Sequence, residues 1–307
     1  MKEKSNSHAG TRARECAKMN LQLQARIDAA IFLLKKMEPI ALKYREFGFI
    51  CAFSGGKDSI VVRSLMKLAG VKHICKYQWT TIDPPEVYHF IQNKCPDVII
   101  DKPLETFWQL CLKHGILPTQ SKRFCCSELK EVRDFNCVVV TGVRAKESYR
   151  RAKRRELEIM TRRRHPDFVR GSLDQFNIYK ESHIDCIKGK DKIIVNPIIN
   201  WTEKDVWDYI QEFNLPVPEL YEQGYNRVGC LFCPMASVKS LIKMEQDYPK
   251  YREAFIRLIH RLRQKRIDKG QLDKYLTLTD EEVFFAWIHK ISYKKMIENK
   301  SQLKLDF

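Results

Sequence analysis

Long hydrophobic runs are missing from this sequence. No apolar stretch approaches the length of a membrane span, and Met1 to Asn20 is polar and basic, unlike the apolar stretch of a secretory signal. The sequence also contains no internal repeat and no low-complexity segment. We therefore expect a cytoplasmic globular protein with no membrane partner, and not a repeat array.

Acidic residues are scarce relative to basic ones. The chain has 38 Asp and Glu against 55 Lys and Arg, which gives a net charge of +17. An evenly spread excess would be an ordinary lysine-rich surface, but much of this excess is gathered in residues 144–170. Gathered cations attract polyanions, so we expect nucleic acid or a phosphorylated small molecule as a partner. The basic residues of the segment include Arg144, Lys146, Arg150, Arg151, Lys153, Arg154, Arg155, Arg162, Arg163, Arg164 and Arg170.

Residues 47–60 hold the most specific motif of the chain. A predicted buried strand meets the turn Ser54-Gly55-Gly56, and a helical pattern starts near Asp58. The glycines let successive backbone N–H groups point at one spot, to which the helix N-terminus and Lys57 add positive charge. Glycine turns between strand and helix are common, but Ser-Gly-Gly-Lys-Asp-Ser in this context predicts a phosphate-binding loop. It is not a Walker A loop, because that pattern needs a further glycine and a Ser or Thr in place of the aspartate.

Strands that alternate with helices predict an α/β fold with a doubly wound, mostly parallel sheet. Short apolar runs indicate five strands, at Phe49 to Phe53, Val71 to Gln78, Val98 to Ile100, Val138 to Thr141 and Ile193 to Val195. Ligands of such sheets bind beyond the carboxyl ends of the strands, at a topological switch point. The phosphate loop lies at such an end, and so do two later candidates, Asp83 and Gly142.

The chain of 307 residues, with 44% hydrophobic and 30% charged residues, is long enough for one large domain and an appendage. We predict a disordered basic tail over 1–15 and an α/β domain over 16–200. Residues 201–307 are expected to form a mainly helical part that carries a Cys-x-x-Cys motif. A basic amphipathic helix is expected there, around 250–269.

Two cysteine pairs have the spacing of a metal site. The chain has 11 cysteines, and disulfide frameworks are rare in the cytoplasm. The pairs are Cys125-Cys126 and Cys230-Leu-Phe-Cys233, and together they would complete a site of four thiolates. Spacing alone does not distinguish an iron–sulfur cluster from zinc, which can be purely structural. The cysteines at 16, 51, 75, 95, 111, 137 and 186 are expected to be ordinary core or surface residues.

These motifs resemble known families. Ser-Gly-Gly-Lys-Asp-Ser is the signature of the N-type ATP pyrophosphatases, whose loop holds the ATP pyrophosphate and whose acidic residue helps to bring magnesium. Four further motifs are similar, in order, to those of the phosphoadenosine phosphosulfate (PAPS) reductase family. They are Arg-x-Cys-Cys-x-x-Leu-Lys, Gly-Val-Arg-x-x-Glu-Ser-x-x-Arg, Asn-Pro-Ile-x-x-Trp and Gly-Cys-x-x-Cys-Pro, within residues 45–240.

The resemblance implies ATP, Mg²⁺ and a 4Fe-4S cluster as cofactors, with zinc as the fallback. Many relatives have Thr at the position of Cys126. The implied catalytic residues are Lys57, Asp58, Arg144 and Arg151. The implied ATP and phosphate ligands are Ser54, Gly55, Gly56, Lys57, Asp58, Ser59, Asp83, Gly142, Arg144, Glu147, Ser148 and Arg151. The implied metal ligands are Cys125, Cys126, Cys230 and Cys233.

The chain departs from the sulfonucleotide reductases in two respects. They attack sulfur with a cysteine near the C-terminus, whereas this sequence has no cysteine after Cys233, and they usually lack the full Gly-Gly-Lys-Asp loop. The motifs are more similar to the iron–sulfur sulfurtransferases, such as the ATP pyrophosphatase component of DNA phosphorothioation. That implies adenylylation of a nucleic acid, DNA more than tRNA, with a cysteine desulfurase as sulfur donor.

Two alternatives remain open from the sequence: a PAPS or adenosine 5'-phosphosulfate (APS) reductase, and a non-catalytic regulator of the same fold that binds nucleic acid. The expected nucleic-acid patch is Arg154, Arg155, Arg162, Arg163 and Arg164, together with the basic helix around 250–269.

Overall fold

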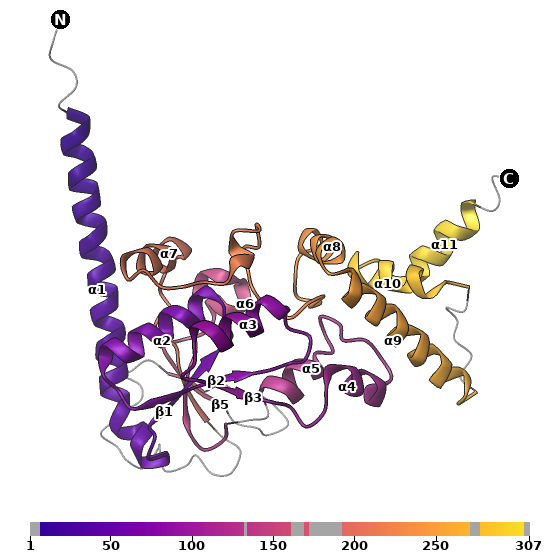
Figure 1. The fold of residues 1–307 in the computed structure, drawn as a ribbon, viewed down its shortest axis with the longest axis horizontal. Coiled ribbons are helices and arrows are strands. Elements are labelled where there is room, and N and C mark those ends of the chain that lie inside the picture. The colour runs from indigo at the N-terminus through magenta and orange to yellow at the C-terminus, as the bar shows by residue number, and fades with distance from the viewer. Residues whose placement is uncertain (1–6, 132–133, 161–168, 172–191, 271–276, 304–307) are drawn as a thin grey trace, which may run out of the picture. The chain divides into compact units, whose positions relative to one another are not determined.

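The computed structural model describes residues 7–131, 134–160, 169–171, 192–270 and 277–303 (Figure 1). The chain forms two compact units. The first unit comprises residues 1–78, 86–101 and 134–221, and the second comprises 79–85, 102–133 and 222–307. Within the described ranges, no helix combines the length and apolar character needed to cross a membrane.

The first unit contains a seven-stranded sheet in the order β3-β2-β1-β4-β7-β5-β6. Its five predicted strands are all present and pair in parallel, which confirms the α/β class and the mostly parallel sheet. They are β1 (Phe49–Phe53), β2 (His73–Gln78), β3 (Val98–Asp101), β4 (Val138–Val140) and β7 (Lys192–Val195).

Two antiparallel strands extend the sheet beyond the five predicted ones. They are β5 (Leu157–Met160), which pairs with β7, and β6 (Val169–Gly171), which pairs with β5. The count of five strands was therefore too low. The reason lies in β5, where Glu158 is a fully buried carboxylate in the middle of the strand. Arg154 neutralises it through a 2.5 Å ion pair, so the strand does not show the apolar run by which the others were found.

Helices α1 (Ser7–Tyr44), α2 (Lys57–Ala69) and α7 (Glu203–Glu212) pack together in the first unit, and α1 and α2 also contact β1. The start of α1 differs from the prediction of a disordered tail over 1–15, because the helix begins at Ser7. Good helix formers such as Ala13 fill this stretch, and the helix contains no proline before Pro39. The unit also contains α3 (Pro85–Lys94) and the single-turn α6 (Tyr149–Ala152).

The order of the strands places a topological switch point between β1 and β4. From β1 the chain proceeds outward to β2 and β3, whereas β4 and β7 lie on the other side. The turns that follow β1 and β4 therefore leave the same edge of the sheet side by side. A Cβ added to Gly142, just after β4, would lie 2.9 Å from the backbone carbonyl of Asp58. Only glycine allows this close approach.

The second unit is mainly helical. An aromatic core of Phe107, Phe232, Phe255, Phe284 and Trp287 holds it together, with ring centroids 5.2–5.6 Å apart in four of its contacts. Its helices are α4 (Phe107–His114), α5 (Phe124–Cys126), α8 (Val238–Asp247), α9 (Pro249–Ile267), α10 (Asp280–Ile288) and α11 (Tyr293–Leu303), with a π-helical turn at Ser127–Glu131.

The predicted basic amphipathic helix is α9, which buries Phe255, Leu258, Ile259 and Leu262. The division of the chain differs from the predicted boundary at residue 200. Helix α7 packs on α2 and belongs to the first unit, whereas residues 102–133 join the C-terminal helices in the second. Sequence order cannot reveal this, because the division depends on packing between distant segments.

Candidate functional site

The phosphate loop (residues 54–59) connects β1 to α2, as predicted. Gly55 has a φ of +73°, and a Cβ there would meet the Val87 side chain at 2.7 Å, so the turn requires glycine. The two serines stabilise the turn: the Ser59 hydroxyl donates to the Gly56 carbonyl at 2.8 Å and accepts from the Ser54 N–H at 3.2 Å. The serines thus shape the backbone on which a phosphate would be bound.

Lys57 is the central cation of the loop. Its side chain is only 5% exposed, and Nζ lies 3.4 Å from Glu203 Oε1 and 3.8 Å from Asp58 Oδ2. A buried ammonium is costly unless it is paired, and these two carboxylates offset that cost. The rings of Trp207 and Tyr221 also face Nζ, at 6.0 and 5.6 Å from their centroids.

Asp58 and Arg144 join the two turns of the switch point. Arg144 Nε donates to Asp58 Oδ1 at 2.5 Å, and Arg144 is buried. Glu147 pairs with Arg151 and lies 4.0 Å from Arg144, so carboxylates and guanidinium groups alternate here. The predicted residues from both turns therefore meet in one charged network, which can hold a phosphate or a magnesium ion once these pairs exchange partners.

Two further predicted residues have other roles in the structure. Ser148 is the N-cap of α6 and accepts from the Arg151 N–H at 3.3 Å. Asp83 belongs to the second unit, where it is buried and accepts from the N–H and hydroxyl of Thr80 at 2.8 and 2.7 Å. Its assignment as an ATP ligand stays a prediction.

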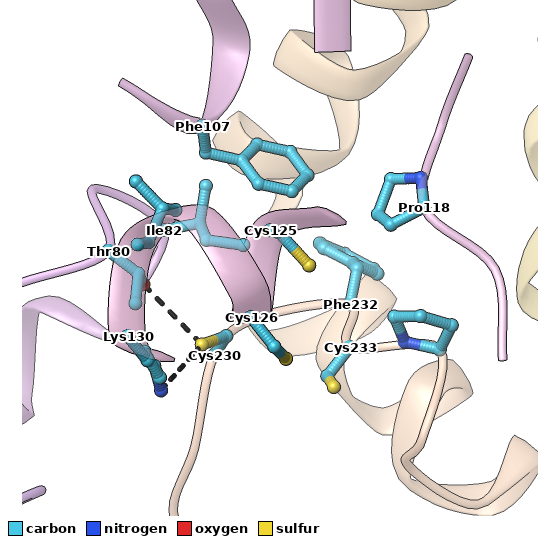
Figure 2. Close-up of a pocket in the computed structure, with 12 residues that line it drawn as sticks. Thr80, Ile82, Phe107, Pro118, Cys125, Cys126, Lys130, Cys230, Phe232 and Cys233 are labelled. Carbon is cyan, nitrogen blue, oxygen red and sulfur yellow. Dashed lines mark hydrogen bonds between the residues drawn. The ribbon is translucent and has the colours of Figure 1, made fainter. Parts of the chain in front are cut away.

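All four predicted cysteine ligands line one pocket of the second unit, the cysteine pocket (Figure 2). Cys125 and Cys126 lie on α5, and Cys230 and Cys233 lie on the loop before α8. The Cys230 sulfur contacts the Lys130 ammonium and the Thr80 hydroxyl, each at 3.4 Å. The other lining residues are Ile82, Phe107, Pro118, Leu129, Phe232 and Pro234.

The pocket perturbs its thiols in different directions. Burial raises the pKa of the Cys230 thiol to about 12, an effect that the Lys130 ammonium opposes. A hydrogen bond with Cys125 lowers the pKa of Cys126 to about 6, whereas the same bond raises the pKa of Cys125. In return, the charge of the Cys230 sulfur raises the pKa of Lys130. The Lys130 ammonium therefore offsets only part of the effect of burial on the Cys230 thiol.

The donor set fits a thiolate-bound metal by its chemistry, because four sulfurs from two segments face one pocket. Among the residues that the structure describes, no three His, Cys, Asp or Glu side chains are arranged closely enough to coordinate a metal ion. Binding would therefore require the thiols to turn toward a common point. The cysteines at 51, 75, 95, 111 and 137 are buried, in agreement with the expectation of ordinary core or surface residues, while the side chains of Cys16 and Cys186 lie outside the described residues.

The expected nucleic-acid patch is described only in part. Arg162, Arg163 and Arg164 lie outside the described residues. Arg154 pairs with the buried Glu158, and Arg155 donates its backbone N–H to the same carboxylate at 3.2 Å. Within the protein, Glu158 therefore neutralises Arg154.

Part of the charge on α9 is also used within the second unit. Arg263 lies 2.6 Å from Asp280. Lys265 and Arg266 donate to the carbonyl groups of Leu112 and Gly115, at 2.8 and 3.3 Å. These side chains stabilise the unit, so fewer of its cations are left for an external polyanion than the sequence suggests.

The sequence did not single out several residues of the two sites. Glu203 and Trp207 come to Lys57 through the packing of α7 on α2, and Tyr221 comes from the 3-10 turn Glu219–Tyr221. No spacing rule connects them to the loop. Lys130 ends the Arg-x-Cys-Cys-x-x-Leu-Lys motif, and its closeness in sequence to a cysteine pair could have identified it as a residue of the site.

Residues 48–236 match the family model of the phosphoadenosine phosphosulfate reductase domain. An uncharacterised protein of Methanocaldococcus jannaschii is 27% identical over 256 residues, which cover 78% of this chain and 45% of the relative. An adenosine 5'-phosphosulfate reductase of Geobacillus kaustophilus is 28% identical over 204 residues, which cover 64% of this chain and 78% of the relative.

Solved structures are also similar. The phosphate complex of phosphoadenylyl-sulfate (PAPS) reductase from Candida auris aligns with a TM-score of 0.39 at 19% identity, covering 67% of this chain and 95% of that one. The FMN adenylyltransferase of Candida glabrata, in complex with FAD and pyrophosphate, aligns with a TM-score of 0.42 at 15% identity, covering 68% and 62%. The chain spans about half the length of two M. jannaschii relatives, 45% and 53%.

Proposed function

Because the chain belongs to the phosphoadenosine phosphosulfate reductase domain family, we propose that it binds ATP at the phosphate loop and activates a nucleic acid for sulfur insertion. One observation carries the proposal. The complete Ser-Gly-Gly-Lys-Asp-Ser loop lies at the switch point of the sheet, with Lys57 buried in it and Asp58 paired with Arg144. A chain that only had to bind a sulfonucleotide would not need this loop.

The proposed reaction separates ATP between its α- and β-phosphates. An oxygen of the acceptor attacks the α-phosphorus, the bond to the β-phosphate oxygen breaks, and pyrophosphate leaves. Lys57 neutralises the charge that develops on that leaving group, and Arg144 and Arg151 take up phosphate oxygens as their carboxylate partners withdraw. Asp58 would hold magnesium, which, when bound, neutralises further phosphate charge. A cysteine desulfurase would supply sulfur as a persulfide, a thiol reductant would reduce it to sulfide with two electrons, and the sulfide would displace AMP from the activated acceptor.

The cysteine pocket is the proposed place of a 4Fe-4S cluster. Cys125, Cys126, Cys230 and Cys233 would hold it, and when bound it would supply a site for sulfide or electrons. Lys130 lies against Cys230 and would keep the sulfur charge balanced. Zinc is the fallback for the same thiols.

A nucleic-acid acceptor, DNA rather than tRNA, is proposed from the basic segment and α9. We expect the affinity for labelled DNA to fall steeply with salt, because each phosphate contact releases counterions. Reversal of Arg162, Arg163 and Arg164 to glutamate should weaken binding about equally for all sequences, as loss of phosphate contacts does. The matched control reverses Lys294, which is exposed and pairs with Glu298 on α11, outside the proposed surface. Titrations of DNA and tRNA at several salt concentrations test this, and salt-independent or absent binding to both would contradict it.

A second candidate is reduction of APS or PAPS, which the names of relatives such as the G. kaustophilus enzyme favour. The two reactions release different products: pyrophosphate from ATP in one case, sulfite from a sulfonucleotide in the other. A non-catalytic regulator would release neither. Measurement of both products with the anaerobically purified chain therefore tests the proposal.

A further inference from the structure

The hydroxyl of Tyr221 occupies a position that a bound anion would need. Lys57 is the first residue of α2, and its backbone N–H is one of the donors that an α-helix leaves without a partner in its first turn. Such donors are the ones that a phosphate takes up. In the structure, the Lys57 N–H donates to the Tyr221 hydroxyl at 2.8 Å.

A neighbouring carboxylate reinforces this arrangement. Glu203 lies 3.4 Å from the Lys57 ammonium, so the backbone donor and the side-chain cation of Lys57 both face groups of the 203–221 segment. The capping box of Thr202 fixes the start of α7, and the Trp207 ring packs edge-on against Tyr221, with centroids 5.1 Å apart. An arriving phosphate must therefore displace the hydroxyl, because one N–H forms one good hydrogen bond at a time.

Tyr221 also lies at a particular place in the chain. It ends the 3-10 turn Glu219–Tyr221 and is the last residue of the first unit. Glu222 opens the C-terminal segment of the second unit, and residues 222–229 lead directly to Cys230. Displacement of Tyr221 therefore frees one end of the stretch that leads to the Cys-x-x-Cys motif.

We propose that Tyr221 is a positioning residue that links occupancy of the phosphate loop to the segment bearing Cys230 and Cys233. Phosphate entry displaces its hydroxyl from the Lys57 N–H, and the released turn gives residues 222–229 more freedom. The inference rests on the proposed phosphate-binding function of the loop. It adds that phosphate binding there changes the freedom of the segment that leads to Cys230 and Cys233.

The first test is calorimetric titration of the full chain with inorganic pyrophosphate. Tyr221→Phe keeps the ring but removes the competing hydroxyl, so it should bind pyrophosphate about threefold to tenfold more tightly than wild type, the worth of one hydrogen bond. The matched control is Tyr225→Phe, because the Tyr225 hydroxyl donates to Asp247 at 2.6 Å within the second unit and has no hydrogen bond with Lys57 among the described contacts. Its affinity should equal that of wild type. Equal or weaker binding by Tyr221→Phe would overturn the inference.

The second test is hydrogen exchange of the backbone amides of residues 222–229. Saturating pyrophosphate should accelerate exchange in wild type, whereas Tyr221→Phe should exchange rapidly even before pyrophosphate is added. Exchange that does not respond to pyrophosphate in wild type would overturn the coupling while leaving the proposed function intact. Failure of wild type to bind pyrophosphate at all would overturn both.

Discussion

Replacement of Lys57 by alanine should slow pyrophosphate release from ATP by about a hundredfold to a thousandfold, the usual effect of removing one preorganised charge donor from a transition state. Lys57 is buried between Asp58 and Glu203, so no neighbouring lysine can take over its position from solvent. The rate is to be measured with magnesium and DNA present, by enzymatic detection of pyrophosphate.

Lys67→Ala is the matched control for this variant. Lys67 lies on the same helix, its side chain is half exposed, and it pairs with Asp97 at 2.9 Å, far along α2 from the loop. Its rate should stay close to that of wild type. If Lys57→Ala is folded by circular dichroism and turns over ATP at the wild-type rate, the loop is not the site of phosphoryl chemistry.

The cysteine pocket leads to the second large effect. Anaerobic purification should give a brown protein that contains iron and acid-labile sulfide, and Cys230→Ala should lose nearly all of both. Cys230 is one of the four proposed ligands, and its sulfur contacts Lys130 and Thr80 in the pocket. Iron and sulfide analysis together with the visible absorption spectrum measures the outcome.

Cys111→Ala provides the comparison, because Cys111 is a fully buried thiol of α4 in the same unit that does not line the pocket. It should retain iron and sulfide. Stoichiometric zinc without iron in the wild-type preparation would identify the pocket as a structural zinc site instead. Equal losses of iron and sulfide in both variants would show that the effect comes from general destabilisation of the unit.

The parallel part of the sheet was predictable, since strands such as Phe49–Phe53 are apolar runs bounded by turn residues. The antiparallel edge was not, because β5 carries Glu158, a buried charge that only its ion pair with Arg154 makes acceptable. Local pattern reveals residues that are buried by their own apolar character. It does not reveal charged residues such as Glu158, whose burial depends on an ion pair with another residue of the chain.

The same distinction applies to the site. The loop glycines and Lys57 could be found because they belong to one motif of consecutive residues, Ser54 to Ser59. Glu203 and Tyr221 could not, because they reach Lys57 by tertiary packing, Glu203 from α7 and Tyr221 from the 3-10 turn Glu219–Tyr221. The assignment of Asp83 stays a prediction: it follows a strand, and in the structure its carboxylate accepts two hydrogen bonds from Thr80.

The most direct measurement of the central claim is a product assay on the anaerobically purified wild-type chain. ATP, magnesium and DNA are supplied in one reaction, and APS or PAPS with a thiol reductant in another. We expect DNA-dependent release of pyrophosphate in the first reaction and no sulfite in the second. Sulfite from the sulfonucleotide, with no pyrophosphate from ATP, would contradict it and identify the protein as a reductase.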